Sequence, residues 1–225
     1  MRILCVAATS FEFLPLVSFL NENGRKIRSD LFVINTIEVQ LLVTGVGIIA
    51  TTYQLTSILH KEKIDLVLNL GVAGSLDPAI QLGDVVEVVS ERIGDLGAED
   101  IDGSFLDLQD LKLPSGNPLD NQSGQMINSD SSEYGILKKV AGVTVNKVHG
   151  SQDSIDALKR KYPGVQIESM EGAAIFFVCL NEKIPFLEIR GISNFVEPRN
   201  KENWVLDLAI DNLNQVAIQL IQSIT

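Results

Sequence analysis

Two carboxylates and one amide follow strand-like segments at positions where a sheet would bring them together. Glu12 follows the first apolar segment, Glu171 opens an apolar helical segment, and Asn194 follows the last strand-like segment. Ligands of doubly wound sheets bind beyond the carboxyl ends of parallel strands, so these side chains are candidates for one site. A carboxylate can act as a general base on water, and an amide both donates and accepts hydrogen bonds.

Each of these three residues also has a purely structural interpretation. A glutamate in the first turn of a helix interacts favourably with the helix dipole, which applies to Glu171 and equally to Glu12. Asn194 can cap the turn after its strand. The small residues Gly172 and Ala173 beside Glu171 favour a functional helix start, because they let it approach a ligand or another backbone closely.

A glycine-rich segment offers a different interpretation. Gly45 and Gly47 satisfy the pattern G-x-G-x-x-A between a predicted strand and a predicted helix, as in dinucleotide-binding folds. The acidic residue expected about 20 positions later is Asp65. It stands at the start of the next strand, whereas a ribose-binding acid belongs at that strand's end, where Asn69 stands. A nucleotide-binding oxidoreductase or binding protein therefore competes with a tight turn whose N–H groups face a small ligand.

Metal and nucleophile chemistry have little support in the sequence. Only two histidines occur, His60 and His149, and no cluster has the spacing of a zinc site. Cys5 and Cys179 lie in apolar segments with no neighbouring histidine, and no G-x-S-x-G motif occurs. We therefore expect no metal, no cofactor and two reduced, buried thiols.

Strand-like and helix-like segments alternate along most of the chain, which predicts an α/β fold with a sheet covered on both faces. No linker or internal repeat interrupts this order, so we expect residues 1–225 to form one domain. The predicted strands are 2–8, 30–34, 37–43, 65–70, 85–89, 142–147, 165–167 and 186–189, and the predicted helices begin near Leu14 and cover 48–63, 154–161, 170–180 and 201–224.

Residues 94–133 break the alternation. They are rich in Gly, Pro, Ser, Asn and Asp, with the turn signals LPSGNP at 113–118 and NQSG at 121–124. A structureless loop of this length is uncommon in a compact domain and is usually functional. We therefore expect a lid or a subunit contact rather than simple disorder.

The charge balance excludes some classes of partner. Lys and Arg number 18 against 29 Asp and Glu, which gives a net charge of −11 and a pI near 4.6. Such a chain repels a phosphodiester backbone, so nucleic-acid binding is not expected. No apolar run reaches the roughly 18 residues that would span a bilayer. We expect a cytoplasmic protein with no membrane partner.

Five short segments share a pattern with known proteins: G-V-G at 45–47, N-L-G-V-A-G at 69–74, G-D-V-V at 83–86, E-S-M-E-G-A-A at 168–174 and R-G-I-S-N at 190–194. Together they resemble the nucleoside phosphorylase/nucleosidase superfamily over nearly the whole chain. Glu12, the Met170-Glu171 pair and the segment from Arg190 to Ser193 are similar to the methylthioadenosine/S-adenosylhomocysteine nucleosidase branch. The resemblance implies a three-layer αβα fold around a mixed, largely parallel twisted sheet, and a homodimer.

Two positions depart from the adenine nucleosidases. Those enzymes carry an Asp that donates a proton to purine N7 where this chain has Asn194, and a Ser where it has Val72. With D-L-G-A-E-D at 95–100 and the tail at 194–204, these departures look most like the futalosine hydrolase family. That resemblance implies hydrolysis of futalosine to hypoxanthine and dehypoxanthine futalosine in menaquinone biosynthesis. An adenine-type nucleosidase or a purine nucleoside phosphorylase remains the alternative with the same fold.

The resemblance also implies roles for individual residues. Glu12 would be the general base on water. Glu171 would accept hydrogen bonds from the ribose hydroxyls, with Met170 under the sugar, and Ser193 and Asn194 would hold the base. Arg190 would orient these groups or pair with Glu188. The base and sugar pocket would also include Val72, Ala73, Gly74, Val148 and His149, and a slot for the carboxyphenyl group would take Val46, Ile101, Phe105 and Trp204, with Arg199 or Lys201 as its cation.

The attacking group and the base follow partly from residue chemistry. Phosphorylases of the superfamily bind phosphate through arginines, and no arginine occurs between Ile3 and Asn23, so water is the expected acceptor. The amide of Asn194 can pair with N7, O6 or N1–H of a 6-oxopurine. Hypoxanthine also departs without full protonation, because its oxygen delocalises negative charge. Asn194 therefore favours an inosine-like nucleoside.

Overall fold

The sheet at the centre of the fold is mixed, and its middle strands are parallel. The computed structural model describes residues 1–113, 124–129 and 137–224. In it, β1 Arg2–Ala7 lies between β4 Ile37–Val43 and β5 Leu66–Ser75, parallel to both. β12 Phe186–Phe195 continues the sheet parallel to β5. The carboxyl ends of β1, β5 and β12 therefore meet at one edge of the sheet.

Beyond β12 the sheet turns back toward β5. β6 Val85–Glu91 runs antiparallel to β12, β10 Lys138–Thr144 is parallel to β6, and β11 Ile167–Ser169 is parallel to β10. β11 then pairs antiparallel with the end of β5, which places Glu168 beside Gly74. This closure brings a strand from the far side of the sheet to the same edge as β5 and β12.

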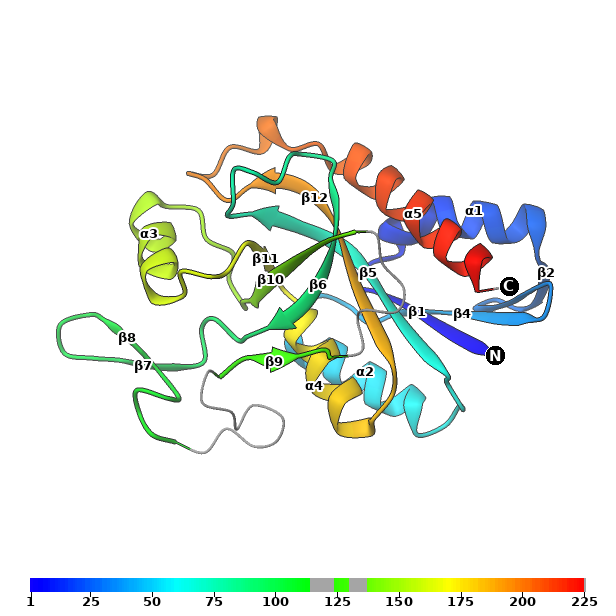
Figure 1. The fold of residues 1–225 in the computed structure, drawn as a ribbon, viewed down its shortest axis with the longest axis horizontal. Coiled ribbons are helices and arrows are strands. Elements are labelled where there is room, and N and C mark those ends of the chain that lie inside the picture. The colour runs from blue at the N-terminus through cyan, green and yellow to red at the C-terminus, as the bar shows by residue number, and fades with distance from the viewer. Residues whose placement is uncertain (114–123, 130–136, 225) are drawn as a thin grey trace.

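Helices cover both faces of the sheet (Figure 1). α1 Leu14–Asn23 and α5 Leu206–Ser223 lie on one face, and α2 Ile48–Leu59 and α4 Gly172–Glu182 lie on the other. β1 shows why both faces are covered: Ile3 and Cys5 belong to the core under α1 and α5, whereas Leu4 and Val6 belong to the core under α2 and α4. The predicted three-layer α/β fold with a mixed sheet is confirmed.

The predicted elements differ from the observed ones mainly at their ends. β5 and β12 continue to Ser75 and Phe195, past the glycines that the sequence analysis assigned to turns. A strand was missed at β2 Arg25–Arg28, because it is an exposed edge strand of charged residues with no apolar pattern. The remaining elements are β3 Leu31–Ile34, α3 Gln152–Lys161 and the 3₁₀ helices η1 Ser10–Phe13 and η3 Lys201–Asn203.

The described parts of segment 94–133 contain short strands. β7 Gly97–Glu99 and β8 Phe105–Asp107 form an antiparallel hairpin that projects from the body of the molecule (Figure 1). β9 Met126–Ile127 pairs with β6 and so joins the main sheet. Residues 114–123 and 130–136 lie outside the described part of the chain. The expected lid or subunit contact stays a prediction.

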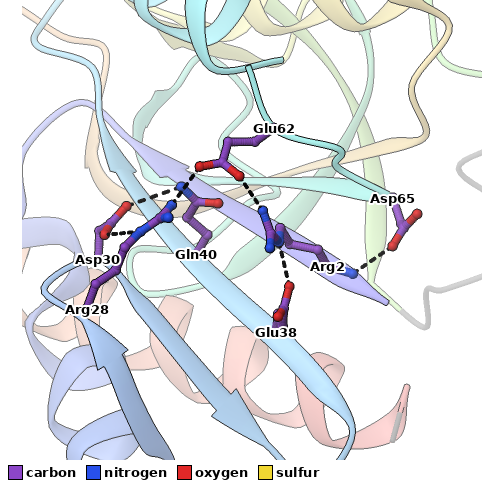
Figure 2. Close-up of polar contacts among 7 residues, drawn as sticks. All are labelled: Arg2, Arg28, Asp30, Glu38, Gln40, Glu62 and Asp65. Carbon is purple, nitrogen blue, oxygen red and sulfur yellow. Dashed lines mark hydrogen bonds and ion pairs between the residues drawn. The ribbon is translucent and has the colours of Figure 1, made fainter. Parts of the chain in front are cut away.

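Charged side chains connect the strand ends at the edge opposite to the carboxyl ends (Figure 2). The guanidinium of Arg2 pairs with Glu38 at 2.6 Å and with Glu62 at 2.5 Å, and its backbone N–H donates to Asp65 at 2.7 Å. Arg28 pairs with the second oxygen of Glu62 at 2.9 Å. Hydrogen bonds from Arg28 and Arg2 lower the pKa of Glu62. Asp65 is therefore part of this network. It lies at the edge of the sheet opposite to the carboxyl ends, beyond which a ligand would bind.

The described helices include no candidate for a membrane span. Within residues 1–113, 124–129 and 137–224, no helix combines the length and apolar character needed to cross a bilayer.

Candidate active site

A cavity of about 520 Å³ lies at the edge where the carboxyl ends of β1, β5 and β12 meet. Most of the predicted site residues line it. The sequence analysis missed the other lining residues, which come from the loop after β1, from β11 and from the start of α5. The predicted lining residues are Glu12, Val46, Val72, Ala73, Gly74, Val148, Met170, Glu171, Ser193, Asn194, Arg199 and Trp204, and the missed ones are Ala8, Thr9, Phe11, Glu168, Ser169, Leu206 and Ile210.

Glu12 is fixed at the cavity wall by the 3₁₀ turn in which it lies. One carboxylate oxygen accepts hydrogen bonds from the backbone N–H of Thr9 at 2.8 Å and from its hydroxyl at 3.0 Å. The other oxygen accepts a longer bond from the N–H of Val72, at 3.3 Å. Asn214 of α5 holds the turn in place, because its amide donates to the Glu12 carbonyl at 2.9 Å. Glu12 is thus a buried, oriented carboxylate and not a solvated helix residue.

Glu171 reaches across the cavity to the glycine turn before α2. It is the N-cap of α4, yet its side chain makes no capping hydrogen bond within that helix. Its Oε1 instead accepts the backbone N–H of Gly47 at 2.9 Å. Burial raises the pKa of Glu171, and the nearby Glu12 carboxylate adds to this, while Arg190 and the Gly47 N–H act in the opposite direction. The purely structural role in the first helical turn does not describe this contact.

The same contact weakens the dinucleotide interpretation of the glycine turn. The N–H of Gly47 is taken by Glu171, and the N–H of Gly45 donates to the carbonyl of Ala8 at 3.0 Å. Both glycines have a positive φ, which explains their presence without a phosphate. Asn69, at the position of a ribose-binding acid, is buried and donates to the Val6 carbonyl at 3.0 Å. The turn thus donates to the carboxylate of Glu171, and its Gly45 and Gly47 N–H groups are not free to bind a pyrophosphate.

We expect Glu171→Gln to raise stability near neutral pH while it lowers activity. A carboxyl whose pKa is raised by folding favours the native state below its unfolded pKa, and that contribution is lost as the pH rises through the folded value. Glutamine has no charge to bury, so the variant avoids the destabilisation that the ionised carboxylate of Glu171 causes in the wild type. The melting-temperature difference between variant and wild type should therefore be small at pH 4, grow as the pH rises and then level off. A variant less stable than wild type at pH 7 would contradict this.

Arg190 lies beneath the cavity and does not line it. It is buried, and its Nε donates to Glu188 at 2.8 Å while Nη2 donates to Asn69 at 2.7 Å. A Cβ on Gly71 would lie 2.0 Å from Nη1 of Arg190, so only glycine leaves room for this guanidinium. The arginine therefore orients buried groups and pairs with Glu188, and it is not among the residues that line the cavity.

The small residues at the start of α4 make room for buried carboxyl groups. A Cβ on Gly172 would lie 2.3 Å from Oε1 of Glu91 and 2.5 Å from Oε1 of Glu188. Thr144 links these groups to the helix, since its hydroxyl donates to Glu91 at 3.0 Å and accepts the N–H of Ala173 at 2.7 Å. Burial and the neighbouring Glu188 raise the pKa of Glu91. Gly172 is therefore explained by protein packing and not by a close ligand.

Asn194 lies where β12 bulges next to Gly74. Its carboxamide oxygen accepts from the Ser193 hydroxyl at 2.9 Å, and one N–H donates to the Phe195 carbonyl at 2.9 Å. The local bond to Phe195 is the kind expected of a turn-capping residue. Within the described part of the chain the second N–H has no partner, and the side chain lines the cavity. Asn194 therefore has one donor available to a ligand.

A smaller space of about 50 Å³ adjoins the large cavity. Its walls include His149, Asn194, Arg199 and Trp204. The Arg199 guanidinium lies over the Trp204 ring, 5.3 Å from its centroid, and the backbone N–H of Arg199 donates to the Gly150 carbonyl at 3.1 Å. The loops after β10 and β12 are thus joined at this end of the site.

Three predicted slot residues do not reach the cavity of this chain. Ile101 is fully exposed in the turn between β7 and β8. Phe105 on β8 packs partly against a satellite core that contains Tyr162 of the loop after α3. Lys201 is exposed at the start of η3. Ile101, Phe105 and Lys201 lie in segments outside the main sheet. No pattern in the sequence predicts where these segments lie relative to that sheet.

Known proteins are similar to this chain in sequence and in fold. Residues 2–225 match the family model described as the phosphorylase superfamily. A futalosine hydrolase of Acidothermus cellulolyticus is 30% identical over 181 residues, covering 80% of this chain and 73% of the relative. A 5'-methylthioadenosine/S-adenosylhomocysteine nucleosidase of Bacillus licheniformis is 24% identical over 232 residues, covering 100% of both chains.

Solved structures extend the likeness to the whole fold. The futalosine hydrolase of Helicobacter pylori superimposes with a TM-score of 0.80 at 17% identity, covering 99% of this chain and 98% of that one. The 5'-methylthioadenosine/S-adenosylhomocysteine nucleosidase of Neisseria meningitidis, in complex with methylthio-immucillin-A, gives a TM-score of 0.78 at 18% identity, with 99% of both chains covered. At these identities the likeness concerns the fold.

Proposed function

The chain belongs to the phosphorylase superfamily, and from this premise we propose that it hydrolyses the N-glycosidic bond of futalosine and releases hypoxanthine. Its relatives include both futalosine hydrolases and methylthioadenosine/S-adenosylhomocysteine nucleosidases. One observation carries the proposal: Glu12, Glu171 and Asn194 converge on a single cavity. Two carboxylates serve the sugar and the water, and a neutral amide serves the base.

Glu12 is the general base in this mechanism. Oε1 of Glu12, whose hydrogen bond within the described residues is the long one from Val72, accepts a proton from a water molecule as the water oxygen attacks C1′ of the ribose. The bond between C1′ and N9 breaks, its electron pair leaves with the base, and the ribosyl group passes through an oxocarbenium-like state, as in glycoside hydrolysis. The departing purine anion takes up a proton from water, and Glu12 returns its proton to the solvent, so the cycle consumes one water molecule and releases free hypoxanthine.

Glu171 and Asn194 act on opposite parts of the substrate. Glu171 accepts hydrogen bonds from the ribose hydroxyls, which orient the sugar and stabilise its developing positive charge electrostatically. Met170 packs beneath the sugar. The free N–H of Asn194 donates to N7 of the purine, where negative charge accumulates as the glycosidic bond lengthens. Arg190 lies beneath the cavity, pairs with Glu188 and interacts electrostatically with Glu171 and Glu12.

The 5′ side of futalosine carries a carboxyphenyl group, and the cavity offers apolar walls for it. Phe11, Leu206 and Ile210 line the cavity in addition to the predicted Val46 and Trp204. Arg199 is the cation among the lining residues and supplies the charge for the carboxylate. Arg199 and Trp204 also border the smaller space with Asn194, so in our proposal this pair lies between the base and the 5′ group.

The overall assembly is also part of the proposal. We treat residues 1–225 as one domain, because a single sheet carries both cores and the family match runs over residues 2–225. The homodimer implied by the resemblance has a candidate surface on α2, where Ile49 and Tyr53 are exposed beside a groove of about 540 Å³.

The nature of the acceptor gives the direct test of the function. The purified protein is incubated with futalosine, inosine or methylthioadenosine, with and without inorganic phosphate, and the released base and sugar are identified. We expect hypoxanthine release from futalosine at the same rate in both conditions, with a free reducing sugar as the second product. Strict phosphate dependence with ribose-1-phosphate would identify a phosphorylase. Faster release of adenine from methylthioadenosine would identify an adenine nucleosidase.

A further inference from the structure

Glu168 and His149 form a hydrogen-bonded pair that the mechanism above does not use. Glu168 lies on β11 and is buried, with 4% of its surface exposed. Its Oε2 accepts the backbone N–H of His149 at 3.1 Å, and its Oε1 faces Nδ1 of the His149 ring in a second, short contact. Two bonds from one buried carboxylate fix both the backbone and the ring of His149.

The pair lies next to Asn194 because of the sheet closure. Glu168 is opposite Gly74 in the pairing of β11 with β5, and Asn194 is opposite the same glycine in the pairing of β12 with β5. A Cβ on Gly74 would lie 3.1 Å from Nδ2 of Asn194, so the glycine leaves the amide free to approach. Glu168, His149 and Asn194 all border the space of about 50 Å³.

The contact with Glu168 determines the hydrogen-bonding character of the histidine. An ionised carboxylate only accepts hydrogen bonds, so the Nδ1 atom that faces it carries the proton. In the neutral ring the other nitrogen, Nε2, then has a lone pair and is an acceptor. With the ring neutral, the small space contains one acceptor from His149 and one donor from Asn194.

We propose that His149 reads the six-membered edge of the purine, with Nε2 accepting a hydrogen bond from N1–H of a 6-oxopurine, and that Glu168 is a positioning residue that sets the tautomer. This proposal rests on the nucleosidase function above. A base held at N7 by Asn194 presents its 6-substituent and N1 to the rest of the small space. Hypoxanthine carries a proton on N1, whereas adenine carries a lone pair there. Adenine would therefore leave two buried acceptors facing each other.

Two variants test the proposal. In Glu168→Gln the side-chain amide can donate to Nδ1, which permits the tautomer with the proton on Nε2. We expect the kcat/KM preference for futalosine over its adenine counterpart, aminofutalosine, to fall about 10- to 100-fold, the cost of one mismatched buried group. His149→Phe, which removes the acceptor, should cause a similar fall. Adding Glu168→Gln to His149→Phe should change the preference no further, because Glu168 acts through the histidine.

A spectroscopic measurement reports the tautomer independently of activity. The chain has two histidines, and His60 is exposed at the end of α2, so His60→Gln leaves His149 as the single imidazole. Its ¹⁵N chemical shifts should show a protonated Nδ1 and an unprotonated Nε2, and Glu168→Gln in this background should shift the population toward the other tautomer. A protonated Nε2 in the wild-type pair would overturn the proposal.

The activity results separate this inference from the proposed function. If all variants release hypoxanthine with an unchanged preference over adenine, the reading by His149 is wrong while the nucleosidase function stands. If the wild type releases no base from any purine nucleoside, both fail. For a variant that is too slow to assay, calorimetry measures the affinities for free hypoxanthine and free adenine instead. A preference for hypoxanthine that falls with both variants supports the proposal.

Discussion

Glu12→Gln is expected to lower kcat for futalosine hydrolysis by roughly 10²- to 10⁴-fold, the range in which general-base catalysis contributes. Glutamine keeps the size of the side chain and can still accept the N–H of Thr9 through its amide oxygen. It cannot take a proton from water, because a neutral amide is not a base near neutral pH. The affinity for the substrate should change little, since in our mechanism Glu12 acts on the water and not on the nucleoside.

A matched control separates the loss of the base from a loss of charge. Glu22→Gln makes the same change at an exposed position of α1, remote from the cavity. Initial rates of hypoxanthine release and melting temperatures are measured for wild type and both variants. We expect the Glu22 variant to retain wild-type rates and the Glu12 variant to retain most of its stability. Near wild-type rates in both Glu12→Gln and Glu171→Gln would show that this site assignment is wrong.

The positions of Glu12 and Asn194 at one cavity were predictable from the sequence for a simple reason. Glu12 follows β1 and Asn194 lies at the carboxyl end of β12, and parallel strands share one edge at their carboxyl ends. Glu171 follows β11, which is antiparallel to β5, so this rule does not account for its position. What the rule does not give is the partner of each side chain. The contact of Glu171 with Gly47 joins residues that are 124 positions apart and depends on how two helices on one face are placed.

The role of Glu168 was not predictable from strand patterns. Its place beside Gly74 results from the pairing of β11 with β5, which closes the sheet after three intervening strands. The predicted strand at 165–167 overlaps the observed Ile167–Ser169 at one residue, and a short apolar segment does not reveal which neighbour it will have. Glu168 therefore looked like an ordinary residue before the Met170-Glu171 pair.

The roles of the glycines were predicted only in part, because a positive φ and close packing both require a glycine. Gly47 adopts a positive φ, as a tight turn requires. Gly71 and Gly74 were assigned to a glycine-rich turn, yet both lie inside β5, where the absent side chains leave room for Arg190 and Asn194. Composition pointed to a segment that lines the cavity but could not distinguish backbone conformation from close packing.

The prediction for Asn194→Asp has the largest consequence for specificity. In the wild type, the amide accepts from the Ser193 hydroxyl, donates one N–H to the Phe195 carbonyl and keeps the second N–H for the base. An aspartate in the same place keeps the acceptor but has at most one proton to donate, and only when it is protonated. That proton cannot serve both the Phe195 carbonyl and N7, so the bond to the hypoxanthine base weakens.

We expect Asn194→Asp to shift the ratio of kcat/KM for futalosine over aminofutalosine by about 10²-fold or more toward adenine, since sites built to hydrogen-bond one edge reject a mismatched one by such factors. Release of hypoxanthine should fall, and the trace of adenine release should rise as the pH is lowered, because only a protonated aspartate donates. Val72 and the 5′ pocket limit the gain with adenine.

The control variant for this experiment makes the same change from asparagine to aspartate at a position outside the cavity. Asn181 lies on the exposed side of α4, and its amide also donates to a backbone carbonyl, that of Phe177 at 2.8 Å. Asn181→Asp therefore loses the same kind of bond and adds the same charge without touching the cavity, and its substrate ratio should equal that of the wild type. An unchanged ratio in Asn194→Asp as well would mean that Asn194 does not read the base. The preference for hypoxanthine would then have to come from the acceptor on His149, whose variants test that separately.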